Sequence, residues 1–353
     1  MPFFENKIWR IAFWPLSFVM LVISYIRNKL YDYHVFRSYK IDAHVISVGN
    51  ISVGGTGKTP VILALAESLK SKNTSVAILS RGYGRQSSGI LIVSHGEGPL
   101  CDVHQAGDEP FFLATQLPDI PVVVAENRVA GGKLLCEKYN PTIVLLDDGF
   151  QHRRLQRDLD IVLIDLNRLN RNKSLLPAGP YREGIFSLKR AQNILYLNQN
   201  HDTKILLKKL RKKTKGRFFR ADITSRQLWH PETGALVDIS FLTHKKIMVI
   251  CGIGQPARLR VTLDFHEADI TAFLDFKDHH YYTDHEMTAL INKFNNSGAE
   301  LLITTAKDWV KLKDNSKFRQ LPVYIPEHKA SFAPDFIEGI LEHCSLRKSP
   351  DNG

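Results

Sequence analysis

The sequence predicts an α/β fold, with a parallel β-sheet that has helices on both faces, a smaller C-terminal α/β domain and an N-terminal membrane-associated helix. Short runs of apolar, mostly β-branched residues alternate with amphipathic helical patterns, which is the βαβ order of a parallel sheet. A glycine-rich loop follows the first run, and an uncharged apolar stretch precedes it. The 353 residues are 44% apolar and 24% charged, which suits two domains with buried cores.

The apolar stretch near the N-terminus covers residues 11–26 and contains no charged residue. Trp14 lies near one end and Tyr25 near the other, and Arg27 and Lys29 follow. Aromatic residues and cations at the ends of an apolar helix are typical of a membrane interface. A full span needs about 20 apolar residues, so we expect a membrane-anchored or membrane-dipping helix. A buried globular helix is the alternative, and no signal-peptide cleavage motif follows.

Residues 38–215 are predicted to form the larger domain, in which apolar runs expected to be strands alternate with expected helices. The predicted strands lie at residues 44–49, 75–80, 90–95, 121–126, 142–148, 160–165 and 193–197. The predicted helices lie at residues 59–72, 108–117 and 127–139. The strands are nearly continuous in apolar character, which is typical of a parallel sheet buried on both faces.

Residues 216–353 are predicted to form the C-terminal domain, and residues 1–37 form the N-terminal helical segment. A hairpin-like linker is expected near residues 216–243, where Pro-Glu-Thr-Gly is a turn signal. Strands are then expected at residues 246–254, 270–276, 301–308 and 322–327, with helices near 256–264 and 284–296.

The net charge of +11 and the pI near 9.4 favour an anionic partner, such as a phosphate compound, a nucleic acid or a lipid surface. Part of this charge is local, because residues 208–220 hold eight basic residues and no acidic one. The four cysteines form no C-x-x-C pair, which argues against a zinc site or a disulfide framework. They are Cys101, Cys136, Cys251 and Cys344.

The glycine-rich loop lies between the first predicted strand and the first predicted helix. Glycines let backbone N–H groups approach phosphate oxygens, and the helix N-terminus behind the loop favours anions. Lys58 can reach terminal phosphates and the Thr59 hydroxyl can hold Mg²⁺, whereas Ser52 stands where the general motif has glycine. This context predicts a nucleotide site of the P-loop NTPase type. Its residues are Ser52, Val53, Gly54, Gly55, Thr56, Gly57, Lys58 and Thr59.

Two pairs of acidic residues lie at the ends of predicted elements. Asp147 and Asp148 follow a buried strand, and two adjacent carboxylates repel each other unless a cation is present. A solvated turn is the alternative for this pair. Asp108 and Glu109 begin a predicted helix, where acidic residues also serve as ordinary caps. The sequence therefore predicts a magnesium site near the first pair and leaves the role of the second open.

Several arginines are predicted to meet at the carboxyl edge of the sheet. Arg81 and Arg85 follow a strand, Arg128 begins a helix, and Arg182 lies in a loop bent by proline and glycine. Ligands of open α/β sheets bind at this edge, so the set suits a multiply anionic ligand, although each arginine alone could be a surface ion-pair partner. Three histidines in residues 278–286 suggest a catalytic or substrate-contacting histidine, or a plain loop. Zinc is disfavoured because no H-E-x-x-H motif is present.

These segments together resemble the tetraacyldisaccharide 4′-kinase family, the lipid A 4′-kinases of bacterial inner membranes. The matching segments run in order over residues 46–280: SVGGTGKTP, SRGYGR, GDEP, DDGFQHRRLQRDLDIVLID, LPAGPYRE, GIGQP and DHH. The first and fourth are together very specific. In this family serine rather than glycine opens the phosphate loop, so Ser52 fits the resemblance.

The resemblance implies transfer of the γ-phosphate of ATP to the 4′-hydroxyl of a tetraacyl glucosamine disaccharide 1-phosphate. Lys58 would contact the β- and γ-phosphates, and Asp108 would be the base at the sugar hydroxyl, paired with His279 from the second domain. The residues that would hold or assist Mg²⁺ are Thr59, Asp147, Asp148 and Glu109. The residues that would bind phosphate charge or substrate are Arg81, Arg128 and Arg182.

The resemblance also implies a location and a set of partners. The N-terminal helix would hold the enzyme at the inner membrane, with the catalytic domains in the cytoplasm. The expected partners are lipid A disaccharide 1-phosphate and the membrane surface, with no nucleic acid, and the expected state is a monomer.

Three alternative functions have less support in the sequence. A GTPase or metallochaperone-like NTPase would want an N-K-x-D string for guanine, which the sequence lacks. A membrane-tethered regulator would not explain an acid such as Asp108. A nucleic-acid binder would rely on residues 208–220, which no recognition motif accompanies.

Overall fold

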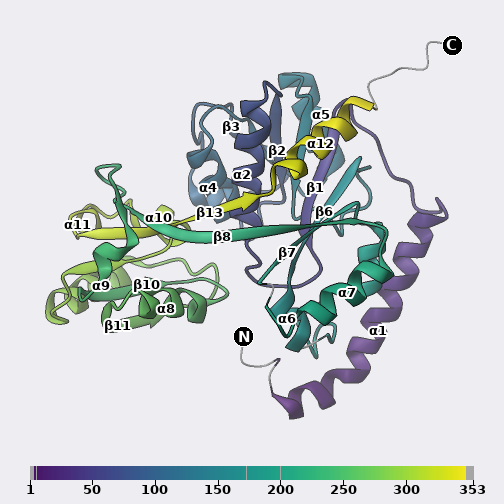
Figure 1. The fold of residues 1–353 in the computed structure, drawn as a ribbon. Coiled ribbons are helices and arrows are strands. Elements are labelled where there is room, and N and C mark those ends of the chain that lie inside the picture. Colours follow the sequence, from purple (N-terminus) through teal and green to yellow (C-terminus); the bar gives the residue numbers. More distant parts are fainter. Residues whose placement is uncertain (1–3, 5, 172, 199, 347–353) are drawn as a thin grey trace.

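The computed structural model describes Phe4 and residues 6–171, 173–198 and 200–346 (Figure 1). The α-helices are α1 (Lys7–Asp32), α2 (Lys58–Ser71), α3 (Val103–Ala106), α4 (Asp108–Gln116), α5 (Arg128–Tyr139), α6 (Leu166–Arg171), α7 (Lys204–Lys213), α8 (Pro256–Phe265), α9 (Asp284–Asn296), α10 (Ala306–Leu312), α11 (Ser316–Arg319) and α12 (Pro334–Leu346). Short 3₁₀ helices cover Ile185–Arg190 and Ile239–Leu242.

The strands are β1 (His44–Asn50), β2 (Val76–Ser80), β3 (Leu91–Ser94), β4 (Val122–Val124), β5 (Ile143–Asp147), β6 (Leu159–Asp165), β7 (Asn193–Leu197), β8 (Arg217–Trp229), β9 (Leu236–Asp238), β10 (Lys246–Cys251), β11 (Asp269–Asp275), β12 (Leu301–Ile303) and β13 (Val323–Phe332). They form one sheet in the order β11-β10-β12-β13-β8-β7-β6-β1-β5-β2-β4-β3, with β9 paired to β8. Most neighbouring pairs are parallel, which confirms the predicted α/β class.

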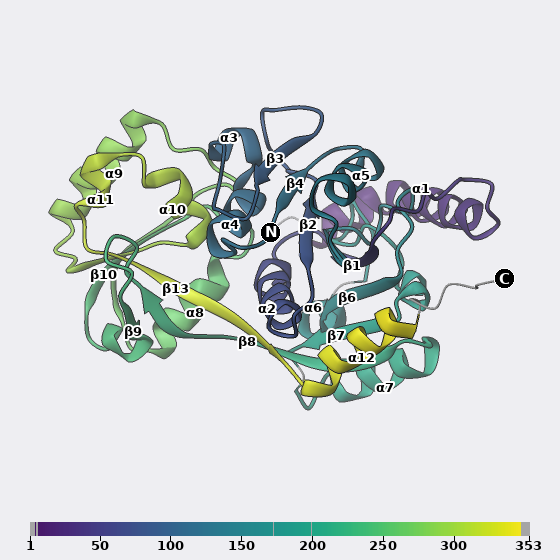
Figure 2. The same ribbon diagram turned by 90° about the horizontal axis from the view of Figure 1, so that it is seen from above.

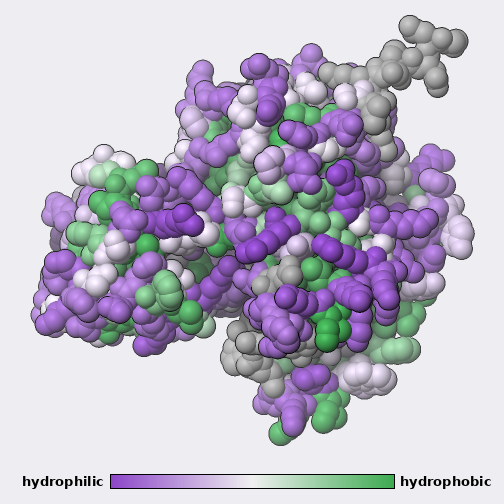
Figure 3. Space-filling model, in the orientation of Figure 1, coloured by the Kyte–Doolittle hydropathy of each residue, from purple (hydrophilic) through white to green (hydrophobic). Residues whose placement is uncertain are grey.

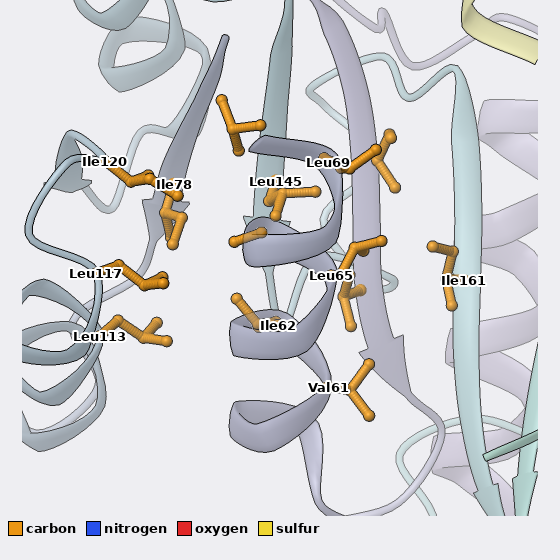
Figure 4. Close-up of a cluster of buried hydrophobic side chains, with 14 of the residues drawn as sticks. Val61, Ile62, Leu65, Leu69, Ile78, Leu113, Leu117, Ile120, Leu145 and Ile161 are labelled. Atoms are coloured by element: carbon orange, nitrogen blue, oxygen red, sulfur yellow. The ribbon is translucent and has the colours of Figure 1, made fainter. Parts of the chain in front are cut away.

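Helices cover both faces of the sheet around β1. Leu145 of β5 faces Ile62 and Leu65 of α2, within a fully buried cluster (Figure 4). The neighbouring Val144 points to the opposite face and packs in a cluster with Leu135 of α5. Because successive side chains of a strand alternate between faces, a strand buried on both sides is apolar at nearly every position.

Two predicted strands differ from the structure. The run at residues 90–95 was expected to be parallel, but β3 pairs antiparallel with β4 at the edge of the sheet. Residues 81–90 contain no helix, and a parallel partner needs a longer, usually helical, crossover. The run at residues 301–308 is a strand only to Ile303. Thr305 then caps α10, because its hydroxyl accepts a hydrogen bond from the backbone N–H of Asp308.

Two long strands, β8 and β13, connect the two halves of the molecule (Figure 2). The first half contains β1 to β7 and the second half contains β9 to β12, each with its neighbouring helices. β8 begins beside β7 in the first half and continues as the antiparallel partner of β13 in the second half. It also pairs antiparallel with β9. After β13 the chain returns to the first half, where Phe336 and Ile340 of α12 are buried in the same cluster as α2. The domain boundary near residue 215 stays a prediction, and β8 begins next to it at Arg217.

The apolar side chains of α1 lie on its outer surface. The buried residues of this helix are the polar Ser17, Ser24 and Asn28, whereas Ile11 is 76% exposed and Phe18 is 52% exposed. Figure 3 shows hydrophobic side chains along the lower right edge of the molecule, where α1 runs. A helix of a globular core would bury its apolar face, so the alternative of a core helix is not supported. Among the described residues, α1 is the one helix long and apolar enough to cross a membrane.

Candidate active site

The phosphate loop lies between β1 and α2. The side-chain amide of Asn50 donates a hydrogen bond to the hydroxyl of Thr56 over 2.7 Å, and both residues are buried. Gly54 and Gly57 have φ angles of 85° and 86°, in the left-handed region that favours glycine. Gly57 is also the N-cap residue of α2, and it has no side chain to occupy the first N–H groups of the helix. Those groups therefore remain available to phosphate oxygens.

A loop at residues 174–184 covers one side of the phosphate loop. Backbone hydrogen bonds from the N–H groups of Val53 and Arg182, of 2.7 and 2.8 Å, join the two loops. Ser52 also forms an isolated antiparallel bridge to this loop. The guanidinium of Arg182 then lies 2.7 Å from Oδ2 of Asp148. The proline- and glycine-bent loop thus places its arginine beside the predicted magnesium site.

Asp147, at the end of β5, is a buried carboxylate. The hydroxyl of Ser80, at the end of β2, donates a 2.8 Å hydrogen bond to its Oδ2 atom. Burial raises the pKa of Asp147 to about 7, and the nearby charges of Glu109 and Asp148 add to this rise. Asp147 is therefore close enough to two other carboxylates, Asp148 and Glu109 of α4, for their charges to act on it.

Asp148 lies next along the chain with a φ angle of 50°. Its Oδ1 atom is 3.4 Å from Nζ of Lys58. Burial would raise the pKa of Asp148, but the positive charges of Lys58 and Arg182 outweigh burial and lower it. The lysine of the phosphate loop is thus held by the carboxylate that follows β5.

Glu109 faces a cation from the second half of the chain. Its carboxylate forms an ion pair with Lys307 of α10. Burial alone would raise the pKa of Glu109, but Lys307 and then Lys58 outweigh burial and lower it. Burial alone would lower the pKa of Lys307. The negative charge of Glu109 and its hydrogen bond together outweigh burial, so the pKa of Lys307 is raised. Both groups are therefore charged at neutral pH.

The acidic cluster fits Mg²⁺ by its chemistry. Carboxylate and hydroxyl oxygens are the ligands that Mg²⁺ prefers, and a nearby cation would relieve the repulsion that raises the pKa of Asp147. The part of the chain that the structure describes contains no group of three or more His, Cys, Asp and Glu side chains arranged around one ion position. Mg²⁺ in nucleotide sites is held by one or two carboxylates together with phosphates and water, so a full protein cage is not required.

Asp108, the first residue of α4, is 1% exposed and has two partners from the second half. Its Oδ2 atom lies 3.1 Å from Nδ1 of His279 and 3.2 Å from Nζ of Lys311. Burial would raise the pKa of Asp108, but the hydrogen bond with His279 and the charge of Lys311 lower it to about 2. The hydrogen bond with Asp108 raises the pKa of His279. The predicted pairing of these residues, which are 171 positions apart, is present as a contact.

The predicted arginines do not all have the same surroundings. Arg81 and Arg128 line the cavity described below, and Arg128 is buried. Burial, and then the charge of Arg81, lowers the pKa of Arg128 to about 10. Arg85 instead forms an ion pair with Glu126. His152 lies near Arg128, and burial followed by that charge lowers its pKa to about 4.

One large cavity brings these groups together. It has a volume of about 1740 Å³ and lies between the two halves of the chain. Lys58, Thr59, Asp147, Asp148, Glu109, Arg81, Arg128, Arg182 and His279 are among its lining residues. Asp108 lies behind the wall and contacts the cavity through His279. The other two histidines of residues 278–286 are outside this set, and His280 contacts Glu286.

Some residues of the site were not predicted from the sequence. Lys307 and Lys311 lie on α10, one turn apart, and reach two adjacent acids of α4. Gln255 donates a hydrogen bond to the carbonyl oxygen of Gly55, so the second half also touches the phosphate loop. The segment around Lys307 contains a lysine and an aspartate after an apolar run, which is a weak signal without the fold.

Comparisons with known proteins found similar structures and sequences. A crystal structure of LpxK from Aquifex aeolicus in complex with ATP is similar, with a TM-score of 0.77 and 33% identity over 96% of this chain and 98% of that chain. The tetraacyldisaccharide 4′-kinase of Syntrophus aciditrophicus is 36% identical over 83% of this chain and 81% of its own length.

A second relative extends over nearly the whole chain. The tetraacyldisaccharide 4′-kinase of Desulfotalea psychrophila is 34% identical over 94% of this chain and 96% of its own length. The family model described as tetraacyldisaccharide-1-P 4′-kinase matches residues 9–345. The chain therefore belongs to the tetraacyldisaccharide 4′-kinase family.

Proposed function

We propose that this chain transfers the γ-phosphate of ATP to the 4′-hydroxyl of a tetraacyl glucosamine disaccharide 1-phosphate, in lipid A biosynthesis. The observation that carries this proposal is the contact between Asp108 and His279. It joins a carboxylate of the first half to a histidine of the second half, at the wall of the cavity that contains the phosphate loop. A nucleotide-binding protein without an acceptor would not need this pair.

ATP is placed with its phosphates at the N-terminus of α2, where backbone N–H groups and Lys58 neutralise their charge. Nζ of Lys58 also lies 3.4 Å from Oδ1 of Asp148. Phosphoryl transfer depends mostly on positioning and on neutralising charge, so Lys58 and the arginines of the cavity should supply much of the rate. Arg81, Arg128 and Arg182 are the proposed partners of phosphate or acceptor charge.

Thr59, Asp147, Asp148 and Glu109 are the proposed residues for Mg²⁺. When bound with ATP, the ion neutralises charge on the terminal phosphates. Ser80 orients Asp147 through its hydroxyl, and Lys307 holds Glu109. These contacts keep the two carboxylates at the carboxyl edge of the sheet, next to the phosphate loop.

The pair of Asp108 and His279 is proposed to accept the proton of the sugar hydroxyl. A hydroxyl is a poor nucleophile at neutral pH, so its proton must be taken as it attacks phosphorus. His279 lines the cavity and its Nδ1 atom is engaged with Asp108. Its Nε2 atom, which lies 3.9 Å from Oδ1 of Asp278, is the ring nitrogen left for the acceptor. From the sequence, Asp108 itself was expected to be the base, but Asp108 is 1% exposed and lies behind the cavity wall. Asp108 is therefore proposed to orient the ring and to stabilise its charged form after the proton has moved.

Closure of the two halves completes this site. Lys307, Lys311, His279 and Gln255 all come from the second half and contact acids or the phosphate loop of the first half. Residues 38–215 and 216–353 are therefore proposed as two units, although α12 of the second unit packs in the core of the first. The approach of the part of the second unit that carries these four residues would shield the γ-phosphate from water. This arrangement limits wasteful hydrolysis of ATP when no acceptor is bound.

The exposed apolar face of α1 is proposed to insert into the cytoplasmic face of the inner membrane. The acceptor is an acylated anionic lipid, so it resides in a membrane, whereas ATP is supplied from the cytoplasm. Basic residues near the surface attract anionic headgroups, at about 1 kcal/mol for each lysine or arginine. The catalytic units would then work as a monomer on the cytoplasmic side, with no nucleic acid involved.

Incubating the purified protein with Mg-ATP and lipid A disaccharide 1-phosphate in detergent tests the proposed reaction. Mass spectrometry of the lipid should show one added phosphate, and the nucleotide should appear as ADP. A protein in which Lys58 is replaced by methionine is the matched control, because it removes the charge that faces the phosphates. A lipid that gains no phosphate with wild-type protein would contradict the proposal.

A further inference from the structure

We propose that Lys311 of α10 is a positioning residue, which holds the Asp108 carboxylate in the orientation that His279 needs. This inference rests on the proposed function, in which Asp108 and His279 accept the proton of the acceptor. Nζ of Lys311 lies 3.2 Å from Oδ2 of Asp108, and both side chains are 2% exposed. Water cannot compete well for a pair that is this deeply buried, so the contact is stronger than a surface ion pair.

The contacts of Asp108 converge on one of its oxygens. Lys311 and His279 both approach Oδ2, whereas no hydrogen bond to Oδ1 is formed among the described residues. The hydroxyl of Tyr281 is also near this carboxylate, and burial together with the charge of Asp108 raises the pKa of Tyr281. With His279 alone, the carboxylate could rotate and exchange its two oxygens. The ammonium group of Lys311 at Oδ2 fixes the rotation of the carboxylate, and the imidazole ring is then held by a fixed acceptor.

The side chain of Lys311 is itself held in place by a contact within the second half. Its Nζ atom lies 3.5 Å from Oδ1 of Asp308, one turn earlier on α10. Asp308 accepts hydrogen bonds from the hydroxyl of Tyr282 over 3.0 Å and from the backbone N–H of Gly252 over 2.9 Å. The position of Lys311 is therefore set by the core of the second half, and Asp108 is oriented only when that half is closed on the first.

Replacing Lys311 by methionine tests this role, because methionine keeps most of the length and removes the charge. A displacement of about 1 Å in catalytic geometry can cost roughly 100-fold in rate, so we expect kcat to fall about 10- to 100-fold. The KM for ATP should stay within about two-fold, because Lys311 does not line the nucleotide cavity. Lys311→Arg, which keeps the charge, should recover part of the lost kcat.

Lys313→Met is the matched control. Lys313 follows α10 and lies over the ring of Phe111 in α4, at 4.7 Å, without contacting Asp108. Lys313 is half-buried and its partner Phe111 is buried, but Lys313 touches neither Asp108 nor the cavity, so this variant should keep kcat within about two-fold of wild type. If Lys311→Met does not fold, Lys311→Gln is judged by the same criteria, with activity expressed per nucleotide-binding site.

The variants Asp108→Asn and Asp108→Asn/Lys311→Met separate this inference from the proposed function. If Lys311 acts through Asp108, the double variant should be no slower than Asp108→Asn, within about two-fold. A wild-type kcat for Lys311→Met, with Asp108→Asn inactive, would overturn the role of Lys311 alone. Losses that multiply in the double variant would also overturn it. A wild-type kcat for Asp108→Asn would instead overturn the proposed proton-accepting pair.

Discussion

At the scale of single residues, the site depends on positions that only one or two residue types can fill. Gly57 is the clearest case, because it combines a positive φ with the close approach of β8. A Cβ at this position would lie 2.2 Å from Cδ1 of Ile223. This close approach ties the shape of the phosphate loop to a strand that connects the two halves.

We expect Gly57→Ala to lower the free energy of unfolding by about 1–3 kcal/mol, measured without nucleotide. The left-handed backbone alone costs about 1–2 kcal/mol for alanine, and the contact with Ile223 must also relax. Gly55→Ala is the control, because a Cβ there would meet nothing within 4 Å and its φ is not positive. Equal unfolding free energies for the two variants would show that this conformation is not required.

The contribution of His279 to the stability of the fold depends on pH. The hydrogen bond with Asp108 raises its pKa above 6.5, burial opposes this rise, Asp278 adds to it and Lys307 reduces it. A raised pKa means that the folded state binds the proton more tightly, so this stabilisation is complete below about pH 6.5 and is lost as the pH rises through the folded pKa.

His279→Asn should therefore be less stable than wild type at about pH 6, and the difference should shrink toward about pH 9. Asparagine is the suitable replacement because the residue has a φ angle of 62°, which asparagine tolerates. Thermal unfolding across this pH range would measure the difference. A gap that widens with rising pH would contradict the sign of the pKa shift.

The residues of the site were predictable where a local motif carries them. Lys58 and Asp147 follow apolar strands in patterns that have one main chemical explanation. Lys311 was not predictable in this way, because its partner Asp108 lies 203 positions earlier in the chain. A lysine on a short helix has no distinguishing pattern of its own. Only the closure of two halves brings it to a buried carboxylate.

At the scale of elements, fully buried strands were easier to predict than strands that are partly exposed. The strands around β1 are apolar on both faces, and their runs match the structure closely. The end of β8 pairs antiparallel with β9 in the segment where a hairpin-like linker was expected. The full length of β8 was not predicted, because the strand begins within the basic residues 208–220 and only some of its side chains are buried. Its partners come from β7 and β13, so its strand character is set by distant segments rather than by its own sequence.

The outer face of α1 gives a test at the same scale. Ile11 and Phe18 are exposed on this helix, whereas Ser17 donates a 2.8 Å hydrogen bond to the carbonyl oxygen of Leu175. We expect Ile11→Glu/Phe18→Glu to fold normally and to bind vesicles of anionic phospholipid at least about 10-fold more weakly. Burying each apolar side chain contributes about 1.5–3 kcal/mol, and a charge at that depth opposes insertion.

Vesicle co-sedimentation measures this binding, and Leu236→Glu is the control. Leu236 is also exposed, but it lies on β9, away from α1. The control should bind vesicles as wild type does. Unchanged binding by the α1 variant would mean that another surface attaches the protein to the bilayer. Deleting residues 1–27 would be less informative, because it also removes Arg27, which pairs with the buried Glu183.

At the scale of the whole molecule, the C-terminal helix makes the two halves depend on each other. Although α12 follows the last strand of the second half, Phe336 and Ile340 are fully buried in the cluster that contains α2. Phe336 also packs against Phe219 of β8, with ring centroids 5.0 Å apart. The helix that carries the phosphate loop at its start is therefore supported by the last helix of the chain.

Phe336→Ala should lower the free energy of unfolding by about 3–5 kcal/mol, the usual cost of removing a buried phenylalanine ring. The loss should appear in the first half as well, because the cavity left by the ring lies in the cluster beneath α2. Denaturant unfolding can be monitored both by nucleotide binding and by tryptophan fluorescence. The midpoint denaturant concentration should fall in both measurements. Phe265→Ala is the control, since Phe265 is 81% exposed and should change stability by less than about 0.5 kcal/mol. If nucleotide binding kept its wild-type midpoint in Phe336→Ala, the last helix would not support the phosphate loop, and the two halves would be stable independently.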